Sequence, residues 1–469
     1  MKKIFFLLTL ALPVFAYSQT NYMEQNLSGN SFATYNMKYY IREINDVVYN
    51  KKLDMILVAG SASNEAEGIN RCVPWFTAFK TNGSIVIDGG QKYNGNSLIN
   101  QFLNKTDCYD SYIYRLIPLS NNMYGINGGL VSILKPDKWN DFNNITYYDF
   151  SHNIGNTHGF YEVKPDKYVA GFYLNSTKSF ILQMVTSDMN VNNTSGQKIG
   201  SFAFGNQTNT AFNMCTQPDA AGNYCAISTW ANPDNGKINV FLQKFKFSST
   251  GISGNPVVSS TRINLPLKKA WQRTLDDGTS YTDSVKTIIA DVFLNLFNPN
   301  HSHVMINKKG NIQMVFTSDW TSPRKRDFVA YLEVTPDGKF VAADTLCTYK
   351  HGSNTALKLK FDGKDSYTVI YQHGGLSEGE NFAADIKTFD AATLKFKRGL
   401  KLKMEHKITK ELYSYNNLAY NDFYSTSIAA GNIVRQELIE GYQYILALHV
   451  NGILDEHKSR MLLVKLNWL

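Results

Sequence analysis

The side chains with the clearest binding chemistry are two tryptophans and two arginines near the middle of the chain. Trp230 and Trp320 each follow a short apolar stretch at nearly the same distance, and Arg324 and Arg326 come soon after Trp320. Exposed Trp and Arg dominate many protein–protein interfaces, and Trp rings also stack on sugars. We predict a binding surface formed by these four residues. The alternative is that each tryptophan covers only its own loop.

Two histidines are the best candidates for metal ligands. His301 and His303 flank Ser302, and residues two apart on a strand lie on the same face. No Asp, Glu or Cys stands near them at ligand spacing. We therefore predict no metal and no other cofactor, and interpret the two histidines as ordinary strand residues.

The sequence contains no recognisable catalytic motif. Nucleophile-elbow, zinc-protease, phosphate-loop and EF-hand patterns are all missing, and Asn232-Pro-Asp-Asn-Gly is typical of a turn. A glycosidase needs two carboxylates that converge across a cleft, and the 39 acidic residues offer too many pairs to choose from. We predict no catalytic residue, and favour a protein that is not an enzyme.

A basic segment lies toward the end of the chain, with lysine or arginine at 395, 397, 398, 401, 403, 407 and 410. These residues partly alternate with apolar ones such as Leu400 and Leu402, as expected of a strand. One interpretation is an outer strand whose lysines discourage edge-to-edge pairing. The alternative is a patch for an acidic partner.

The elements that would position these residues belong to a recurring pattern of paired strands. A short apolar stretch is followed by a polar loop, a second apolar or alternating stretch, and a turn. The first stretches begin at residues 55, 123, 168, 224, 312, 367 and 444, and the copy at 123 is degraded. In the six clear copies the second stretches begin at Trp75, Phe180, Ile238, Phe328, Phe382 and Met461. Asn82-Gly83 and Asp337-Gly338 supply the positive φ of tight hairpin turns.

Seven such copies predict an all-β protein, a β-propeller of about seven four-stranded blades. The irregular spacing excludes a strict solenoid and requires some long loops, with an insertion near 265–305 in which 283–297 is predicted to be a short amphipathic helix. The stretch Phe32–Ile41 has no repeat of its own, and the last copy lacks a following strand. We predict that this N-terminal strand completes the last blade and closes the ring.

The first 18 residues are predicted to be a signal peptide. Lys2 and Lys3 precede an apolar run over 4–15, and Ala16-Tyr17-Ser18 resembles a cleavage site. The run is too short to span a bilayer, and no later stretch is long enough, so residues 19–469 are predicted to be one exported domain that does not span the membrane. The net charge of +8 is mild for this length and does not indicate nucleic acid.

Five cysteines are compatible with an oxidising compartment. Cys215 and Cys225 would close a hairpin-like loop, Cys72 with Cys108 is a looser pairing, and Cys347 would be left over. The alternative is that most of them are small buried side chains.

Two family resemblances follow from these residues. Stretches 55–83 and 444–466 resemble repeats of secreted bacterial β-propellers, which implies a fold and no activity. The ending Phe15-Ala-Tyr-Ser-Gln resembles exported proteins of bacteria with type IX secretion, whose envelope proteins carry O-glycans at sites that Asp283-Ser-Val and Asp344-Thr-Leu match. The C-terminus does not resemble the sorting domains of cargo from that pathway, which favours the periplasm over the cell surface.

The sequence leaves three functions open. The preferred one is a non-catalytic, periplasmic or secreted scaffold that uses one propeller face to bind another envelope protein, such as a subunit of an outer-membrane secretion complex. A glycan-binding protein or glycan-active enzyme is the second. A structural exported protein without a ligand is the third.

Overall fold

The computed structural model describes the chain in segments. These are residues 22–26, 31–37, 40–64, 69–87, 92–93, 96–97, 113–120, 124–128, 131–134, 146–148, 154–165, 167–174, 179–186, 201–204, 210–231, 238–248, 252, 255–274, 280–286, 302–318, 326–350, 355–361, 365–373, 382–404, 423–432, 444–452 and 459–466. In these segments the elements are all β-strands, numbered β1 to β33. Within the described residues there is also no helix long and apolar enough to cross a membrane.

Seven sheets of four or five strands form the body of the protein. The first three comprise β3 (Tyr40–Asn50), β4 (Met55–Asn64), β5 (Ile69–Phe79) and β6 (Ile85–Ile87); β9 (Ile113–Pro118), β10 (Tyr124–Gly128), β11 (Val131–Leu134) and β12 (Thr146–Tyr148); and β13 (Ile154–Lys164), β14 (Lys167–Leu174), β15 (Ser179–Thr186) and β16 (Ser201–Phe204). The next two comprise β17 (Thr210–Met214), β18 (Tyr224–Ala231), β19 (Ile238–Phe245) and β20 (Val257–Arg262); and β23 (Ser302–Ile306), β24 (Ile312–Thr317), β25 (Arg326–Val334) and β26 (Phe340–Lys350). The last two comprise β27 (Thr355–Phe361), β28 (Ser366–His373), β29 (Phe382–Asp390) and β30 (Phe396–Met404), joined by β1 (Tyr22–Asn26); and β31 (Phe423–Asn432), β32 (Tyr444–Gly452) and β33 (Ser459–Leu466), joined by β2 (Ser31–Met37).

The predicted strand pairs are confirmed. Each of the seven copies supplies the second and third strands of one sheet, and all seven pairs are antiparallel. The predicted turns are also correct, since Gly83 and Gly338 both have positive φ, 87° and 83°. The apolar stretches therefore mark the middle two strands of each sheet. β24, for example, is buried along its whole length, as expected of a strand covered on both faces.

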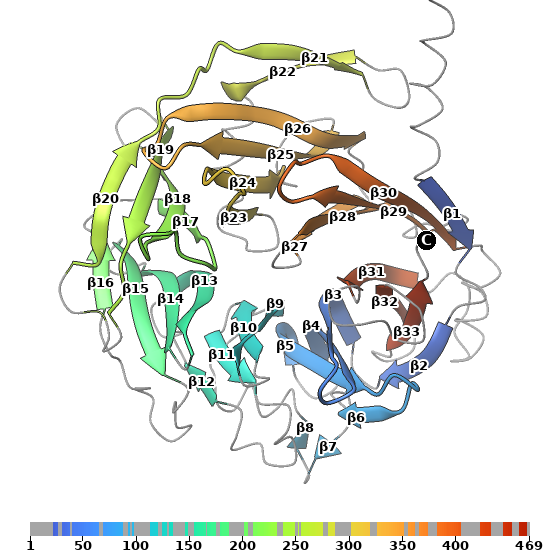
Figure 1. Cartoon of the computed structure of the whole chain (residues 1–469). Helices are drawn as coiled ribbons and strands as arrows, with labels where there is room; N and C mark the ends of the chain where they lie inside the picture. Colours follow the sequence, from blue (N-terminus) through green and yellow to red (C-terminus); the bar gives the residue numbers. More distant parts are fainter. Residues whose placement is uncertain are drawn as a thin grey trace, which may run out of the picture.

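The sheets follow one another around a common centre, toward which the first strand of each sheet lies (Figure 1). Neighbouring sheets touch at this inner side: β3 contacts β9, β10 contacts β13, β13 contacts β17, β17 contacts β23, β24 contacts β27, β28 contacts β31, and β31 contacts β3. The core lies between the sheet faces. One apolar cluster runs from Tyr161 to Ala343 across three sheets, and a second joins Val315 to Tyr367 and Phe389.

The N-terminal strand pairs with the last described strand, as expected. β2 runs antiparallel to β33, with Met37 opposite Ser459. The predicted stretch Phe32–Ile41 was too long, because Tyr40 and Ile41 already belong to β3 in the neighbouring sheet. A short break at 38–39 separates the two strands, and these two residues lie outside the described part.

The basic segment forms β30, the fourth strand of its sheet, but not the edge of that sheet. β1 pairs with β30 in parallel and places Glu24 opposite Lys401 (Figure 1). The interpretation that lysines keep this strand free of pairing is therefore wrong. The rest of the basic segment, 405–410, lies outside the described residues.

The predicted insertion holds a two-stranded sheet of β21 (Ala270–Thr274) and β22 (Ser280–Ser284), outside β26 (Figure 1). Trp271 packs against the core cluster, and Lys269 Nζ lies 6.0 Å from the centre of the Phe340 ring. The expected helix over 283–297 was placed too early, because Asp283 and Ser284 belong to β22; residues 285–286 are helical, and those from 287 lie outside the described part. A second two-stranded sheet pairs β7 (Lys92–Tyr93) with β8 (Asn96–Ser97).

Candidate functional site

Five polar side chains from four of the inner strands form one connected group, which we call the central cluster. Its members are Asp46 on β3, Arg115 on β9, His303 on β23, and Lys358 and Lys360 on β27. β9 and β23 belong to sheets that are not neighbours, and the same holds for β3 and β27. The cluster therefore bonds sheets across the centre.

Asp46 is the acidic member, and it is almost fully buried, with 2% of its surface exposed. It sits beside an irregularity in β3, where the register with β4 shifts between Ile44 and Asp46. A β-bulge of this kind re-aims a side chain. The carboxylate accepts hydrogen bonds from the backbone N–H of Leu116 at 2.8 Å and of Val47 at 2.9 Å, and from Lys360. Asp46 thus ties β3 to two other sheets.

The two lysines of β27 both reach the backbone of β3. Lys358 Nζ donates to the Ile44 carbonyl at 2.6 Å, and Lys360 Nζ donates to the Val47 carbonyl at 2.7 Å as well as to Asp46. Lysines two apart on a strand share a face, which explains why both reach the same strand, β3. Their long apolar stems span the distance from β27 to β3, and their ammonium groups donate to the oxygen atoms of β3.

Arg115 and His303 face each other from β9 and β23. Arg115 Nη1 lies 2.9 Å from His303 Nδ1, and Nη2 contacts Nε2. Burial, together with the positive charge of Arg115, holds the pKa of His303 well below its usual range, while a hydrogen bond with the Leu359 backbone acts in the opposite direction. Burial also lowers the pKa of Arg115, to about 10, so the guanidinium is charged and the imidazole neutral at pH 7.

A second polar group lies beside the central cluster, on the next inner strands. Asn213 Nδ2 donates to the Ser302 carbonyl at 2.9 Å and to its hydroxyl at 2.8 Å. The Tyr161 hydroxyl accepts from the Met214 N–H at 3.0 Å, and burial raises the pKa of that hydroxyl. These bonds connect β13, β17 and β23, so they extend the same cross-sheet bonding around the centre.

The described contacts of the central cluster brace the inner strands, and the cluster lacks the pair of carboxylates that a glycosidase needs. Retaining and inverting glycosidases both need two carboxylates. Asp46 is the one carboxylate in the cluster, and its oxygens already accept from a lysine and two backbone amides. Among the described residues no group of three or more His, Cys, Asp or Glu could hold a metal ion.

The four predicted binding residues are not brought together within the described part of the chain. Trp230 lies inside β18, opposite Thr210 and Asn239, and not in a loop. Arg326 is the first residue of β25, also not in a loop; it is half-buried, with its guanidinium carbon 5.8 Å from the centre of the Phe328 ring. Trp320 and Arg324 lie outside the described residues. Whether these residues bind a ligand stays a prediction.

His303 is the histidine of the predicted pair that the structure describes, and it lies in β23 as expected; His301 lies outside the described part. His303 is 5% exposed and packs near the rings of Phe361 and Tyr367. It does contact a charged group, Arg115, which spacing in the sequence gave no reason to expect. The signal present was a single arginine within the apolar run Ile113-Tyr-Arg-Leu-Ile.

The side chains of Cys215, Cys225 and Cys347 are described, and all three are free thiols. Cys215 and Cys225 lie opposite one another across adjacent strands, with the Cys215 N–H donating to the Cys225 carbonyl at 2.8 Å. Their mutual hydrogen bond raises the pKa of Cys215 and lowers that of Cys225. Burial raises the pKa of Cys347 to about 12. The predicted Cys215–Cys225 link is thus absent here, although the two residues are neighbours.

One candidate glycosylation site is poorly placed in the folded chain. Thr345 of Asp344-Thr-Leu is 8% exposed in β26, and its backbone N–H donates to the Asp344 carboxylate at 2.7 Å. Little of its surface is therefore left for a glycan once the sheet has formed.

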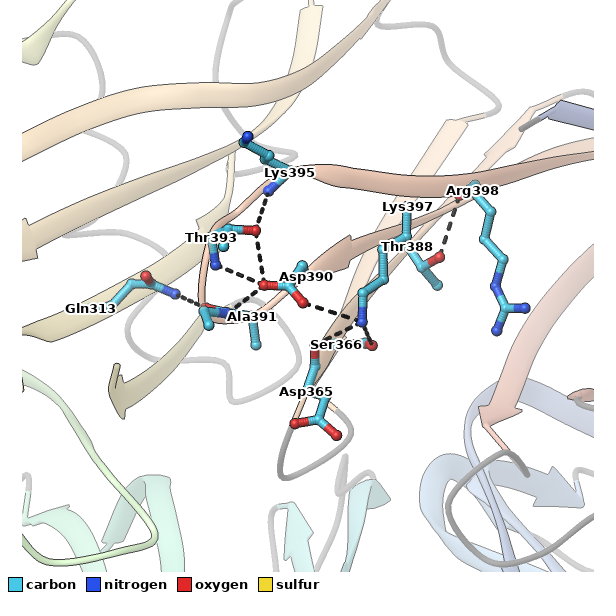
Figure 2. A network of polar contacts seen from close by, with 11 residues as sticks. Gln313, Asp365, Ser366, Thr388, Asp390, Ala391, Thr393, Lys395, Lys397 and Arg398 are labelled. Carbon is cyan, nitrogen blue, oxygen red and sulfur yellow. Dashed lines mark hydrogen bonds and ion pairs between the residues drawn. The ribbon is translucent and has the colours of Figure 1, made fainter. Parts of the chain in front are cut away.

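Figure 2 shows a polar network of a different kind, at the turn between β29 and β30. Asp390 accepts hydrogen bonds from Thr393 N–H and hydroxyl, both at 2.8 Å, and pairs with Lys397 at 3.4 Å. Gln313, from the preceding sheet, donates to the Ala391 carbonyl at 2.9 Å. These bonds stabilise a turn in which Leu394 has a φ of 58°, so the network has a structural role.

Comparison with known proteins identifies no family. No family model and no curated protein matches the chain. Solved structures that resemble it include a protein of unknown function from Dyadobacter fermentans (TM-score 0.37, 9% identity, 93% of this chain and 99% of the other) and an α-L-arabinofuranosidase from Lactobacillus brevis (0.30, 7%, 68% and 92%). The β-propeller domain of Nup133 from Vanderwaltozyma polyspora is a third (0.30, 7%, 92% and 97%). Likenesses of this size decide nothing about the activity of the chain.

Proposed function

We propose that this protein is an exported, non-catalytic scaffold of a bacterial cell envelope, built as a seven-bladed β-propeller that binds another envelope protein. The blade count is supported by seven sheets that touch in chain order around one centre, the last against the first. Ring closure is supported by the pairing of β2 with β33. Closed rings of this kind leave short, protected edges and present broad faces to partners.

The observation that carries the proposal is that polar groups of the central cluster bond to the backbone of other sheets. Lys358 and Lys360 bond to backbone carbonyls of β3, and Asp46 bonds to a backbone amide of β9. Groups used in this way brace the sheets, whereas an acid–base pair must point at a substrate. A rigid, braced ring suits a scaffold, because binding then costs little conformational entropy.

Exposed apolar side chains on the outer strands support the proposed partner-binding surface. Val258 on β20 and Val341 on β26 are 55% and 42% exposed, and Leu267 between them in the sequence is 49% exposed. Position 338, in the β25–β26 turn, lies against Thr261 of β20, which brings these two outer strands together. Apolar side chains gathered on a surface favour protein contact.

A narrower form of the proposal makes the chain a periplasmic subunit of an outer-membrane protein-secretion complex. It rests on the predicted signal peptide and on the resemblance of its ending to exported proteins of type IX secretion bacteria. The glycan-binding alternative keeps Trp230 and Trp320 as its stacking residues.

The test is an affinity pull-down of the tagged protein from gently solubilised native membranes, with mass spectrometry. We expect a stoichiometric envelope protein that is lost in the variant Val258→Ser/Val341→Ser and retained in the control Lys339→Ser, an exposed turn residue. Recovery of the folded protein alone would overturn the scaffold proposal. Glycan-array binding abolished by Trp230→Ala would then support the alternative.

A further inference from the structure

Arg115 has more hydrogen-bond donors than its described surroundings can accept. A guanidinium carries five N–H groups, and a neutral imidazole offers one acceptor nitrogen. Within the described segments, His303 is the group that Arg115 bonds to. Asp46 lies close enough to act on Arg115 electrostatically, but its oxygens accept from Lys360, Leu116 and Val47. Most of the guanidinium is therefore left to some other acceptor.

The positive charge of Arg115 also lacks a carboxylate partner among the described residues. Buried or half-buried cations are normally paired with an anion, because an uncompensated charge away from water is costly. The ion-pair partner of Asp46 is Lys360. Arg115 faces an imidazole that burial keeps neutral, so its positive charge meets no carboxylate of its own in this part of the structure.

A second donor beside the cluster is also unused. Asn45, at the irregularity of β3 next to Asp46, has a buried side-chain amide nitrogen that finds no acceptor among the described groups. Buried polar atoms are seldom left without a partner, and each exception needs an explanation. This amide is therefore a second unsatisfied donor on β3, one residue from Asp46 in the sequence.

We infer that the centre of the ring binds a small oxyanion, a molecule with a carboxylate or phosphate group, held mainly by Arg115. The planar guanidinium recognises both groups through two parallel N–H···O bonds. His303 contacts both Nη atoms of Arg115, and in the proposed site the oxyanion takes the N–H groups that His303 does not use. This site is separate from the outer strands and does not depend on a protein partner.

The experiment is isothermal titration of the folded, full-length mature chain with inorganic phosphate and, separately, with citrate. Both are compared with sodium chloride at matched ionic strength and pH 7.5. We expect saturable, one-site binding of at least one oxyanion and none of chloride. Arg115→Met should weaken that binding at least tenfold. Arg262→Met, which removes the same charge from an exposed position on β20, should leave it unchanged.

Three results would overturn the inference. They are the absence of saturable binding to the wild-type chain, unchanged affinity in Arg115→Met, and an equal loss in Arg262→Met, which would indicate attraction to overall charge. If Arg115→Met does not fold, Arg115→Lys replaces it. Lysine keeps the charge but lacks the two-pronged geometry, so we expect at least threefold weaker binding, and unchanged affinity would count against the site.

Discussion

Single side chains of the inner strands join sheets that are not neighbours. Asp46, Lys358, Lys360 and the Arg115–His303 pair each span the centre. None of these contacts was predictable from spacing, because the partners lie 70 to 314 residues apart. A charged residue within an apolar strand was the one visible sign. Its partner is fixed by the three-dimensional arrangement of the ring.

His303 makes stability depend on pH. Its pKa is lowered in the folded chain, so below the ordinary value of about 6.5 the unfolded chain takes up a proton that the folded chain refuses. Stability from this group is therefore present above that pH and falls as the pH drops, by about 1.4 kcal/mol per unit. Urea unfolding at pH 7.5, 6.5 and 5.5 should show a steeper loss for wild type than for His303→Gln. Parallel losses would contradict the assignment.

The Asp46–Lys360 pair should be strongly coupled. Asp46→Asn leaves the lysine without its counter-ion in a nearly buried place, and we expect a loss of about 3 kcal/mol in the free energy of unfolding. A double-mutant cycle with Lys360→Met should give a coupling of about 1 kcal/mol or more. The exposed pair Asp337–Lys339 is the control and should give no measurable coupling. Equal coupling energies in the two cycles would show that burial does not strengthen the Asp46–Lys360 pair.

At the scale of the element, the antiparallel hairpins were predictable and the unusual pairings were not. Alternating apolar residues and Asn-Gly or Asp-Gly turns located the middle two strands of the sheets, because these signals are local. The parallel pairing of β1 with the basic strand β30 has no local signal. The same limit explains Trp230, which the sequence placed in a loop and the structure places within β18.

The turn between β25 and β26 offers a test of how sheets pack. Gly338 has a φ of 83°, and a Cβ there would come within 2.9 Å of Thr261 in the preceding sheet. Gly310 has nearly the same φ, 79°, with nothing within 4 Å. Gly310→Ala should cost about 1 kcal/mol from the backbone alone, and Gly338→Ala distinctly more. Denaturant unfolding measures both, and Thr261→Ser should recover part of the extra loss. Equal costs would show that the two sheets separate easily.

At the scale of the whole molecule, the N-terminal segment adds one strand to each of two sheets. β1 lies on the outer side of the sheet that begins with β27, and β2 completes the sheet of β31 to β33. The closing strand was foreseen because the last copy lacked a partner strand, whereas the outer one was not. Two successive strands of one short segment therefore bridge two neighbouring sheets.

Two truncations separate the roles of these strands. A mature chain that starts at residue 30 loses β1 and uncovers β30, whose lysine and arginine residues discourage pairing with another chain. We expect it to keep the oligomeric state of the intact chain, with a slightly lower melting temperature. A chain that starts at residue 39 also loses β2, which uncovers the edge of β33, and exposed edges pair with other chains. We expect this second chain to melt lower and to oligomerise in size-exclusion chromatography with light scattering. Identical behaviour of the two chains would deny β2 its closing role.

The pairing of β2 with β33 also has a consequence in time. A ribosome makes β2 long before β33, so the first of these strands has no partner until the intervening sheets have been synthesised. Contacts between such distant segments form late and slowly. The sheet of β31 to β33 therefore stays without its fourth strand until β33 has been made and meets β2, and during this time its unpaired edge is open to chaperones.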